Sequence, residues 1–276
     1  MPAESCRFYC ERLGTDLVEL AGAEAHHAID VLRLRPGDTV ELFDGRGTVA
    51  AAQIRRASPK AMTLAVTRRR QVRRAGPAVR LAFATPKGNR LDWLLEKAVE
   101  LGAAALEPVV FERSVAGGRT LGEHKRQRWL AQCIAAAKQC GLDLLPEIVE
   151  PASLGDYLHA RQAVRQACSS VQQTRQGAPI EGAWLGLLGD TEESALSVPE
   201  AVLEFTGACR VSAGDSGKPG WTIDLLVGPE GGLTAAERAA ALEAGMIPVR
   251  IGHTVLRIET AAVAMLSAVM AWTPRP

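Results

Sequence analysis

The 276-residue sequence has no apolar run near the roughly 18 to 20 residues that a membrane-spanning helix needs. Its first residues also lack a basic segment followed by an apolar one, which is the pattern of a secretory signal. The composition, with 47% hydrophobic and 23% charged residues, is typical of a globular protein that buries a core. These features predict a soluble, cytoplasmic protein without membrane contact, and the length favours two domains.

Cysteine patterns that bind metals are missing as well. None of the six cysteines forms a Cys-x-x-Cys pair, and no group of histidines stands beside them at zinc spacing. Cysteines of this kind are typically reduced and buried thiols in cytosolic proteins. We therefore expect no metal site.

Acidic residues are absent from one long stretch of the chain. Between Asp44 and Asp92 there are 12 Lys and Arg residues and no Asp or Glu, although the net charge of the whole chain is only +1. Such a surface is typical of proteins that bind a polyanion, while a solvated strand face is the alternative for a short basic run. The candidate RNA-binding residues are Arg33, Arg68, Arg69, Arg70, Arg73 and Arg74.

The sequence pattern changes near residue 75. Short β-type runs at 39–44, 48–56 and 62–69, with a helix at 23–34, predict a β-rich domain over residues 1–74. Expected strands at 79–85, 105–111, 183–189, 222–228 and 247–252 then alternate with expected helices at 90–102, 123–141, 234–245 and 258–272. This alternation predicts an α/β domain with a parallel sheet over residues 75–276. We expect the polar stretch SSVQQTRQGAP at 169–179 to be a linker.

Two glycine-containing loops follow apolar strands near the end of the chain, VGPEGGLT at 227–234 and RIGHTVLRIETA at 250–261. Ligands of open parallel sheets bind at the carboxyl ends of the strands, where both loops are expected. Neither loop has the lysine of a phosphate-binding motif, and the Glu230 carboxylate would repel a phosphate. A ligand that is neutral or positive overall, such as an adenosine that carries a sulfonium, suits these loops better.

Both loops closely resemble the corresponding motifs of the RsmE family, SPOUT-class methyltransferases that use S-adenosylmethionine to methylate the N3 atom of a uridine in small-subunit ribosomal RNA. The resemblance covers nearly the whole chain. HHAIDVLRLRPGDTVELFDGRG resembles the signature of the family's N-terminal PUA-like β-barrel, and KGNRLDWLLEKAVELGAAALEPVVFERS and AAAKQCGLDLLPEI resemble its two central motifs. The resemblance implies a knotted parallel sheet flanked by helices, with a C-terminal trefoil knot that the two loops would form. It also implies a homodimer with its active site at the interface and 16S ribosomal RNA or the small subunit as partner.

The resemblance also implies the roles of individual residues. The cofactor-binding residues would be Leu188, Gly189, Gly228, Glu230, Gly231, Gly232, Ile251, Gly252, Leu256, Thr260 and Ala261. Catalysis would fall to Arg257 and Glu259. Arg257 could neutralise charge that develops on the uracil oxygens, whereas Glu259 could be a base, could orient Arg257, or could form a structural ion pair. Glu230 is a further possible base.

Some positions depart from the family pattern. Leu142 and Thr254 stand where the family often has arginine, and Ile258 stands where it often has threonine. If those arginines touch RNA, the choice of substrate or the activity itself is in question. The alternatives are a ribosome-assembly factor that binds RNA with a decayed methyltransferase site, or a SPOUT methyltransferase that acts on another RNA.

Overall fold

The computed structural model describes residues 6–58, 60–74, 76–118, 120–174, 183–192, 194–208 and 221–273. The chain divides into two compact units. The first comprises Met1–Arg73 and Ile134–Leu145, and the second comprises Arg74–Cys133 and Pro146–Pro276. The sequence pattern assigns 134–145 to the α/β domain, whereas the structure groups this segment with the first unit.

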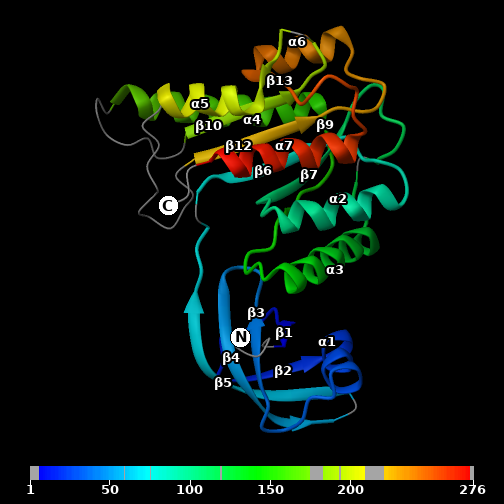
Figure 1. The fold of residues 1–276 in the computed structure, drawn as a ribbon, viewed down its shortest axis with the longest axis vertical. Coiled ribbons are helices and arrows are strands. Elements are labelled where there is room, and N and C mark those ends of the chain that lie inside the picture. Colours follow the sequence, from blue (N-terminus) through cyan, green and yellow to red (C-terminus); the bar gives the residue numbers. More distant parts are fainter. Residues whose placement is uncertain are drawn as a thin grey trace. The chain divides into compact units, whose positions relative to one another are not determined.

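The first unit is built on a curled five-stranded sheet with the order β1-β3-β4-β5-β2 (Figure 1). Its strands are β1 (Arg7–Tyr9), β2 (Leu17–Ala21), β3 (Thr39–Phe43), β4 (Thr48–Ala57) and β5 (Ala61–Gln71). β1 pairs with β3 in parallel, and the other pairs are antiparallel. The register of β4 against β5 shifts at two points, which is how bulges bend and twist a sheet.

The expected helix at 23–34 is present as two short elements, α1 (Gly22–His26) and a π-helix, η1 (His27–Val31). Ala28 of the π-helix is fully buried in the core of the first unit. Phe8, Leu42, Ile54 and Met62 from four different strands fill the same core. The alternating burial of strands such as β2 gives each strand one face toward this core and one toward solvent.

The second unit contains a parallel sheet with the order β11-β13-β10-β12-β6-β7-β8, and β9 pairs with β7 beside this path. Its strands are β6 (Ala78–Phe83), β7 (Ala105–Val110), β8 (Glu147–Ile148), β9 (Ala152–Ser153), β10 (Ala183–Gly189), β11 (Leu196–Ser197), β12 (Trp221–Val227) and β13 (Met246–Arg250). Central strands such as β10 and β12 are buried on both faces, as their nearly continuous apolar sequences predict.

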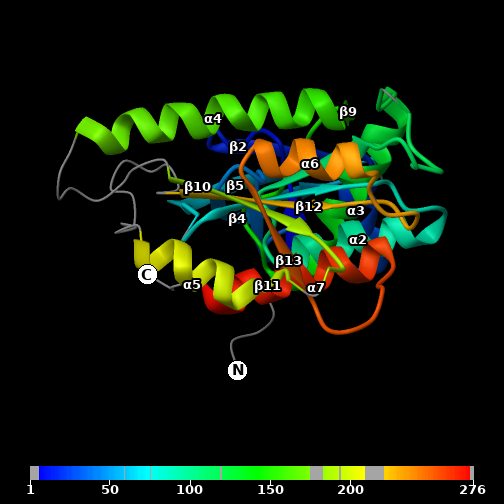
Figure 2. The same cartoon turned by 90° about the horizontal axis from the view of Figure 1, so that it is seen from above.

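Helices cover both faces of this sheet. They are α2 (Asn89–Glu100), α4 (Leu154–Thr174), α5 (Val198–Ala208), α6 (Ala235–Glu243) and α7 (Ile258–Trp272), whereas α3 (Glu123–Cys140) is divided between the two units. Figure 2 shows α4 and α6 on one face and α2, α5 and α7 on the other. No helix in the described part of the chain is long and apolar enough to cross a membrane. The predicted α/β architecture with a separate β-rich unit is therefore confirmed.

The order of the strands carries one further feature. β12 and β13 follow one another in the chain but lie on opposite sides of β10, so the chain passes across β10 between them. The two glycine-containing loops follow these same two strands. The trefoil knot that the resemblance implies stays a prediction.

One expectation about a linker was wrong. Residues 169–174 of the polar stretch SSVQQTRQGAP belong to α4, and residues 175–179 lie outside the described residues. The helix is anchored near its start, where Tyr157 and Leu158 are buried against the second unit's core. Tertiary packing of that first half outweighs the weak helix propensity of serine.

A buried ionic network lies within the second unit. Arg161 donates to Glu107, and its Nε lies 3.1 Å from Asp224 Oδ1. Arg80 lies 3.3 Å from Glu107 and 3.7 Å from Asp224, and Trp184 donates its indole N–H to Asp224. Burial raises the pKa of Asp224, although Arg161 and Trp184 oppose the rise. Two arginines therefore compensate two carboxylates that have little contact with water.

Candidate functional site

The first of the two loops, which we call the glycine loop (residues 228–233), connects β12 to α6. Thr234 caps α6, and Glu237 completes a capping box with it. The other Glu237 oxygen accepts from the backbone N–H of Glu112 at 2.7 Å. Arg113 donates to the carbonyl of Gly231 at 2.8 Å. The segment after β7 thus holds the glycine loop from outside, through contacts that the sequence pattern does not indicate.

The second loop, which we call the arginine loop (residues 251–257), connects β13 to α7. Gly252 has φ of 72°, a left-handed conformation that favours glycine. Arg257 is the N-cap residue of α7, but its side chain makes no capping hydrogen bond. That side chain is exposed and has no ion-pair partner among the described residues. The Arg257 guanidinium is therefore available to a ligand.

A cavity of about 450 Å³ lies at the carboxyl ends of β10, β12 and β13, between the two loops. Its lining comprises Leu188, Gly189, Asp190, Thr191, Glu192, Val227, Gly228, Pro229, Glu230, Gly231, Gly232, Leu233, Arg238, Val249, Ile251, Thr254, Val255, Leu256, Ile258, Ala261 and Met265. The edge of the sheet is where ligands of parallel α/β folds bind. The volume is that of an ordinary small-molecule site.

One side of the cavity is charged. Arg238 donates to Asp190 at 2.8 Å and to Glu192 at 2.7 Å. The hydrogen bond to Asp190 raises the pKa of the Arg238 guanidinium. With Glu230 on another wall, the lining carries more acidic than basic side chains. We did not single out Asp190, Glu192 or Arg238 from the sequence. The position of Asp190 directly after the strand 183–189 is a signal that could have indicated it.

Nine of the eleven expected cofactor-binding residues line this cavity, namely Leu188, Gly189, Gly228, Glu230, Gly231, Gly232, Ile251, Leu256 and Ala261. Gly252 and Thr260 are not part of the lining. Both are neighbours in sequence of residues that do line it, and both are exposed. The structure thus brings most of this set together around one space.

The two expected catalytic residues lie beside the cavity and not in its lining. Glu259, in the first turn of α7, is buried, and its Oε1 lies 3.7 Å from Arg90 Nε. Arg90 Nη1 also lies 3.7 Å from Glu230 Oε1. Arg90 was not among the expected site residues. Its position at the start of α2, the helix after β6, could have indicated it, because the carboxyl end of β6 lies at the same edge of the sheet as that of β12.

Several arginines of the basic stretch bind groups of the first unit itself. Arg69 donates to the carbonyls of Leu13 and Thr15 and pairs with Asp16. Arg70 Nη1 lies 3.0 Å from Asp143 Oδ2, and its Nη2 lies 3.6 Å from Glu41. These two guanidiniums are therefore partly neutralised by acids that lie far away in the sequence.

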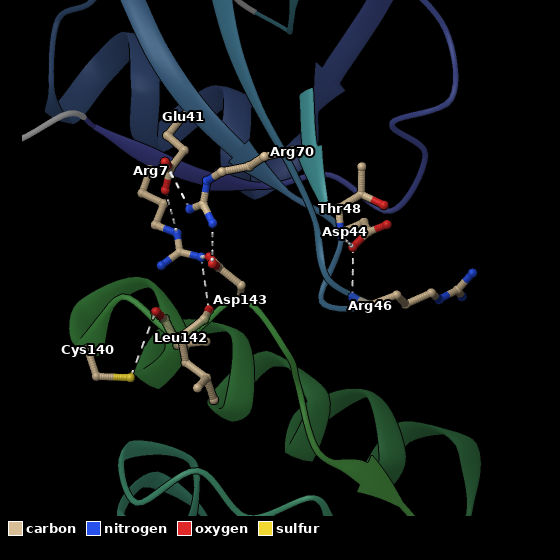
Figure 3. A network of polar contacts seen from close by, with 10 residues as sticks. Arg7, Glu41, Asp44, Arg46, Thr48, Arg70, Cys140, Leu142 and Asp143 are labelled. Atoms are coloured by element: carbon tan, nitrogen blue, oxygen red, sulfur yellow. Dashed lines mark hydrogen bonds and ion pairs between the residues drawn. The ribbon is translucent and has the colours of Figure 1, made fainter. Parts of the chain in front are cut away.

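Arg7 completes the network around Asp143. It donates to Asp143 and to the carbonyl of Leu142, the latter at 2.9 Å (Figure 3). At position 142, where the family often has arginine, the backbone thus accepts a hydrogen bond. The contacts of Arg7 and Arg70 fasten the turn after α3 to the sheet of the first unit, which explains why 134–145 groups with it. The other two departures, Thr254 and Ile258, line the cavity.

The remaining arginines divide into two kinds. Arg74 is partly buried and donates to the carbonyl of Gly102 at 2.7 Å, and burial lowers the pKa of its guanidinium. Arg33, Arg68 and Arg73 are exposed and have no ion-pair partner within the described ranges. Arg33 also has φ of 56°, which is unusual for a residue with a side chain. The exposed three are the better candidates for contact with an external polyanion.

The described residues contain no group of three or more His, Cys, Asp or Glu side chains arranged to hold a metal ion. Cys133 is buried, and burial raises its pKa to about 12. Its thiol is therefore protonated at neutral pH and unsuited to metal binding or nucleophilic chemistry.

Comparisons with known proteins agree with this geometry. A family model described as an RNA methyltransferase domain matches residues 74–198 and 200–270, and one described as an RNA methyltransferase PUA domain matches residues 20–67. The chain is 32% identical to ribosomal RNA small subunit methyltransferase E of Mycobacterium bovis, over 92% of this chain and 86% of that protein. It is 27% identical to the protein of the same name from Bacillus subtilis, over 91% of this chain and 88% of that protein.

A solved structure is similar over nearly its whole length. This is the crystal structure of ribosomal RNA small subunit methyltransferase E from Neisseria gonorrhoeae bound to S-adenosyl methionine, with a TM-score of 0.72 and 27% identity. The match covers 98% of both chains. By its sequence and its fold, the chain belongs to the ribosomal RNA small subunit methyltransferase E family of RNA methyltransferases.

Proposed function

We propose that the protein transfers a methyl group from S-adenosylmethionine to the N3 atom of a uridine in 16S ribosomal RNA. The observation that carries this proposal is the cavity between the glycine loop and the arginine loop, at the carboxyl ends of three parallel strands. Similarity to a protein solved with S-adenosyl methionine supports the cofactor. The N3 position rests on the resemblance of the two loops to the RsmE motifs.

The charge of the cavity fits this cofactor. The lining carries three carboxylates, those of Asp190, Glu192 and Glu230, and one arginine, Arg238, so it has an excess of negative charge. S-adenosylmethionine carries a sulfonium and an ammonium against one carboxylate, and it has no phosphate for these acids to repel. The expected apolar walls, Leu188, Ile251, Leu256 and Ala261, would enclose its adenine and methionine parts.

When bound, S-adenosylmethionine supplies a methyl group on a sulfonium leaving group. Methyl transfer would form a bond between uracil N3 and the methyl carbon and break the carbon–sulfur bond, which leaves a neutral thioether. N3 must lose its proton before or during this step, and the negative charge that develops spreads onto the flanking uracil oxygens until the new bond neutralises it. The exposed Arg257 guanidinium is suited to stabilise that charge, in the manner of an oxyanion site. Positioning of the two reactants by the loops supplies a further part of the rate.

The position of the carboxylates favours Glu230 over Glu259 as the acceptor of the N3 proton. Glu230 lines the cavity and its side chain is 40% exposed, so a substrate can reach it. Glu259 is buried outside the lining and faces Arg90. A base must come within hydrogen-bond reach of the proton that it removes. We therefore assign Glu259 a role through Arg90 and not in proton transfer.

We propose that the first unit binds RNA and that the active form is a homodimer in the cytoplasm. The match of residues 20–67 to a PUA domain and the exposed Arg68 and Arg73 support the first point. Large apolar side chains remain exposed on adjoining helices of one sheet face, Trp93 on α2, Leu203 on α5 and Trp272 on α7, and these support the second. A second copy of the chain would cover them.

The proposed function is tested by calorimetry with S-adenosylmethionine, followed by methylation of 16S ribosomal RNA and of small subunits from a deletion strain. Mass spectrometry of the product maps the modified atom. We expect micromolar binding and one methylated uridine, carrying the methyl at N3. Binding with methylation of a different RNA would point to another substrate. RNA binding without methyl transfer would point to a ribosome-assembly factor instead.

A further inference from the structure

We propose that Arg90 is a positioning residue that ties together the glycine loop and the arginine loop, the two loops that line the cavity. Its guanidinium lies 3.7 Å from two carboxylates. Nη1 faces Glu230 Oε1 of the glycine loop, and Nε faces Glu259 Oε1 at the end of the arginine loop. This inference rests on the proposed function, because it assigns a role within the same site.

The local structure places Arg90 at the edge of the sheet. β6 pairs in parallel with β12, so both strands end at the same edge. Gly88, with φ of 62°, turns the chain after β6 into α2, and Arg90 falls in the first turn of that helix. The Arg90 side chain is 44% exposed, so its guanidinium lies at the surface of the site, not in the core.

The two carboxylates come from the two segments that border the cavity. Glu230 lies within the glycine loop and belongs to the lining. Glu259 directly follows Ile258, which also belongs to the lining, and lies at the junction of the arginine loop with α7. Arginine is suited to this geometry because its planar fork presents five N–H donors, whereas lysine presents a single point charge.

Glu259 depends on Arg90 for its charge compensation. Its other oxygen, Oε2, is buried and has no hydrogen-bond partner among the described residues. The amino end of α7 favours a negative charge in its first turn, but that effect is modest. A buried carboxylate with one unpaired oxygen is costly, so the pair with Arg90 fixes where the start of α7 can lie. This accounts for a buried glutamate that does not reach the cavity.

Loss of the Arg90 side chain should therefore loosen both walls at once. We expect Arg90→Ala to increase hydrogen exchange in peptides that cover residues 228–233 and 252–260, because both lose a restraint. We expect kcat for methyl transfer to fall at least about tenfold, because small displacements of positioned reactants are expensive. Arg90→Lys should recover part of both effects, since an ammonium can face one carboxylate but not both.

The matched control is Arg128→Ala. Arg128 pairs with Asp92 of α2 at 2.7 Å. The substitution therefore removes an arginine that also contacts α2 but forms no ion pair with either loop. We expect its exchange in the two loops and its kcat to equal those of the unchanged protein. Equal exchange and kcat in Arg90→Ala and in the unchanged protein would overturn the proposal.

A double-mutant cycle separates positioning from direct action on the substrate. If Arg90 acts through Glu259, then Arg90→Ala combined with Glu259→Gln should reduce kcat hardly more than Arg90→Ala alone. Fully additive losses would contradict that route. If the unchanged protein methylates no ribosomal RNA, the proposed function fails, whereas hydrogen exchange and the calorimetric affinity for S-adenosylmethionine still decide the role of Arg90.

Discussion

Arg161 Nε lies 3.1 Å from Asp224 Oδ1 inside the second unit, where the two side chains are 9% and 1% exposed. Arg161 also donates to the buried Glu107. We expect Arg161→Met to destabilise the second unit by about 3–5 kcal/mol, because it leaves two buried carboxylates with only Arg80 for compensation. Urea unfolding followed by tryptophan fluorescence reports this unit, since all five tryptophans belong to it.

The loss should also depend on pH. Burial already raises the pKa of Asp224, and removal of Arg161 takes away the main opposing charge. When the pKa of a carboxyl is higher in the folded than in the unfolded state, the free energy of unfolding decreases as the pH rises toward and through the folded-state pKa. The difference between Arg161→Met and the unchanged protein should therefore be smaller at pH 5 than at pH 8. Lys97→Met, which removes a solvated cation that pairs with Glu96 and Glu100, should change the free energy of unfolding much less than Arg161→Met, and equally at both pH values.

Asp143 should stabilise the first unit in a similar way, through ion pairs with little contact to water. Its side chain is 12% exposed and accepts from both Arg7 and Arg70 (Figure 3). We expect Asp143→Ala to cost about 2 kcal/mol, because it leaves the nearly buried Arg7 without its closest partner. Hydrogen exchange of peptides from β3 and β5 measures this loss.

A matched variant in the same unit is Asp16→Ala. Asp16 also pairs with an arginine of β5, Arg69, but its side chain is 91% exposed. Its removal should change the opening free energy obtained from exchange of the same peptides by less than about 0.5 kcal/mol. Similar losses in the two variants would mean that the network around Asp143 does not fasten the turn after α3.

The sequence predicts the fold best where hydrophobic periodicity is strong. The strands that become β10 and β12 and the helix that becomes α7 are apolar enough to indicate their type unaided. α4 and α5 were not anticipated, because few of the side chains described in these helices are buried, Tyr157 and Val202 among them. The short β1 pairs with β3 through a register that no local pattern encodes.

The candidate site, like the fold, can be predicted from the sequence only in part. Glycines and apolar residues of the two loops follow family motifs, and most of them line one cavity. Arg90, Asp190 and Arg238 pair with partners that are distant in sequence, so the sequence pattern indicates none of these pairs, although Arg90 and Asp190 follow expected strands. From composition alone, all arginines of the basic stretch are equal candidates for contact with RNA. In the fold, however, Arg69 and Arg74 donate hydrogen bonds to backbone carbonyls of the protein itself.

This division among the arginines leads to a prediction for RNA binding. Arg68→Glu combined with Arg73→Glu should weaken binding to 16S ribosomal RNA and reduce the salt slope of the affinity by about 2, one for each lost phosphate contact. Filter binding across a range of KCl concentrations measures the slope. Lys97→Glu combined with Arg128→Glu changes the net charge equally but lies in the second unit, and it should leave the slope unchanged. An unaltered slope in the first pair would assign Arg68 and Arg73 to a merely solvated face.

Arg257→Ala tests the charge-stabilising group of the proposed reaction. The Arg257 side chain caps nothing, pairs with no acid in the described part of the chain and stands outside the cavity lining, so its removal should leave folding and the affinity for S-adenosylmethionine nearly unchanged. We expect kcat to fall by about two to three orders of magnitude, because one donor to a developing oxyanion is lost. Calorimetry and single-turnover methylation separate the two effects. Weakened cofactor binding with normal turnover would instead make Arg257 part of the cofactor site, and the charge on the uracil oxygens would need another partner.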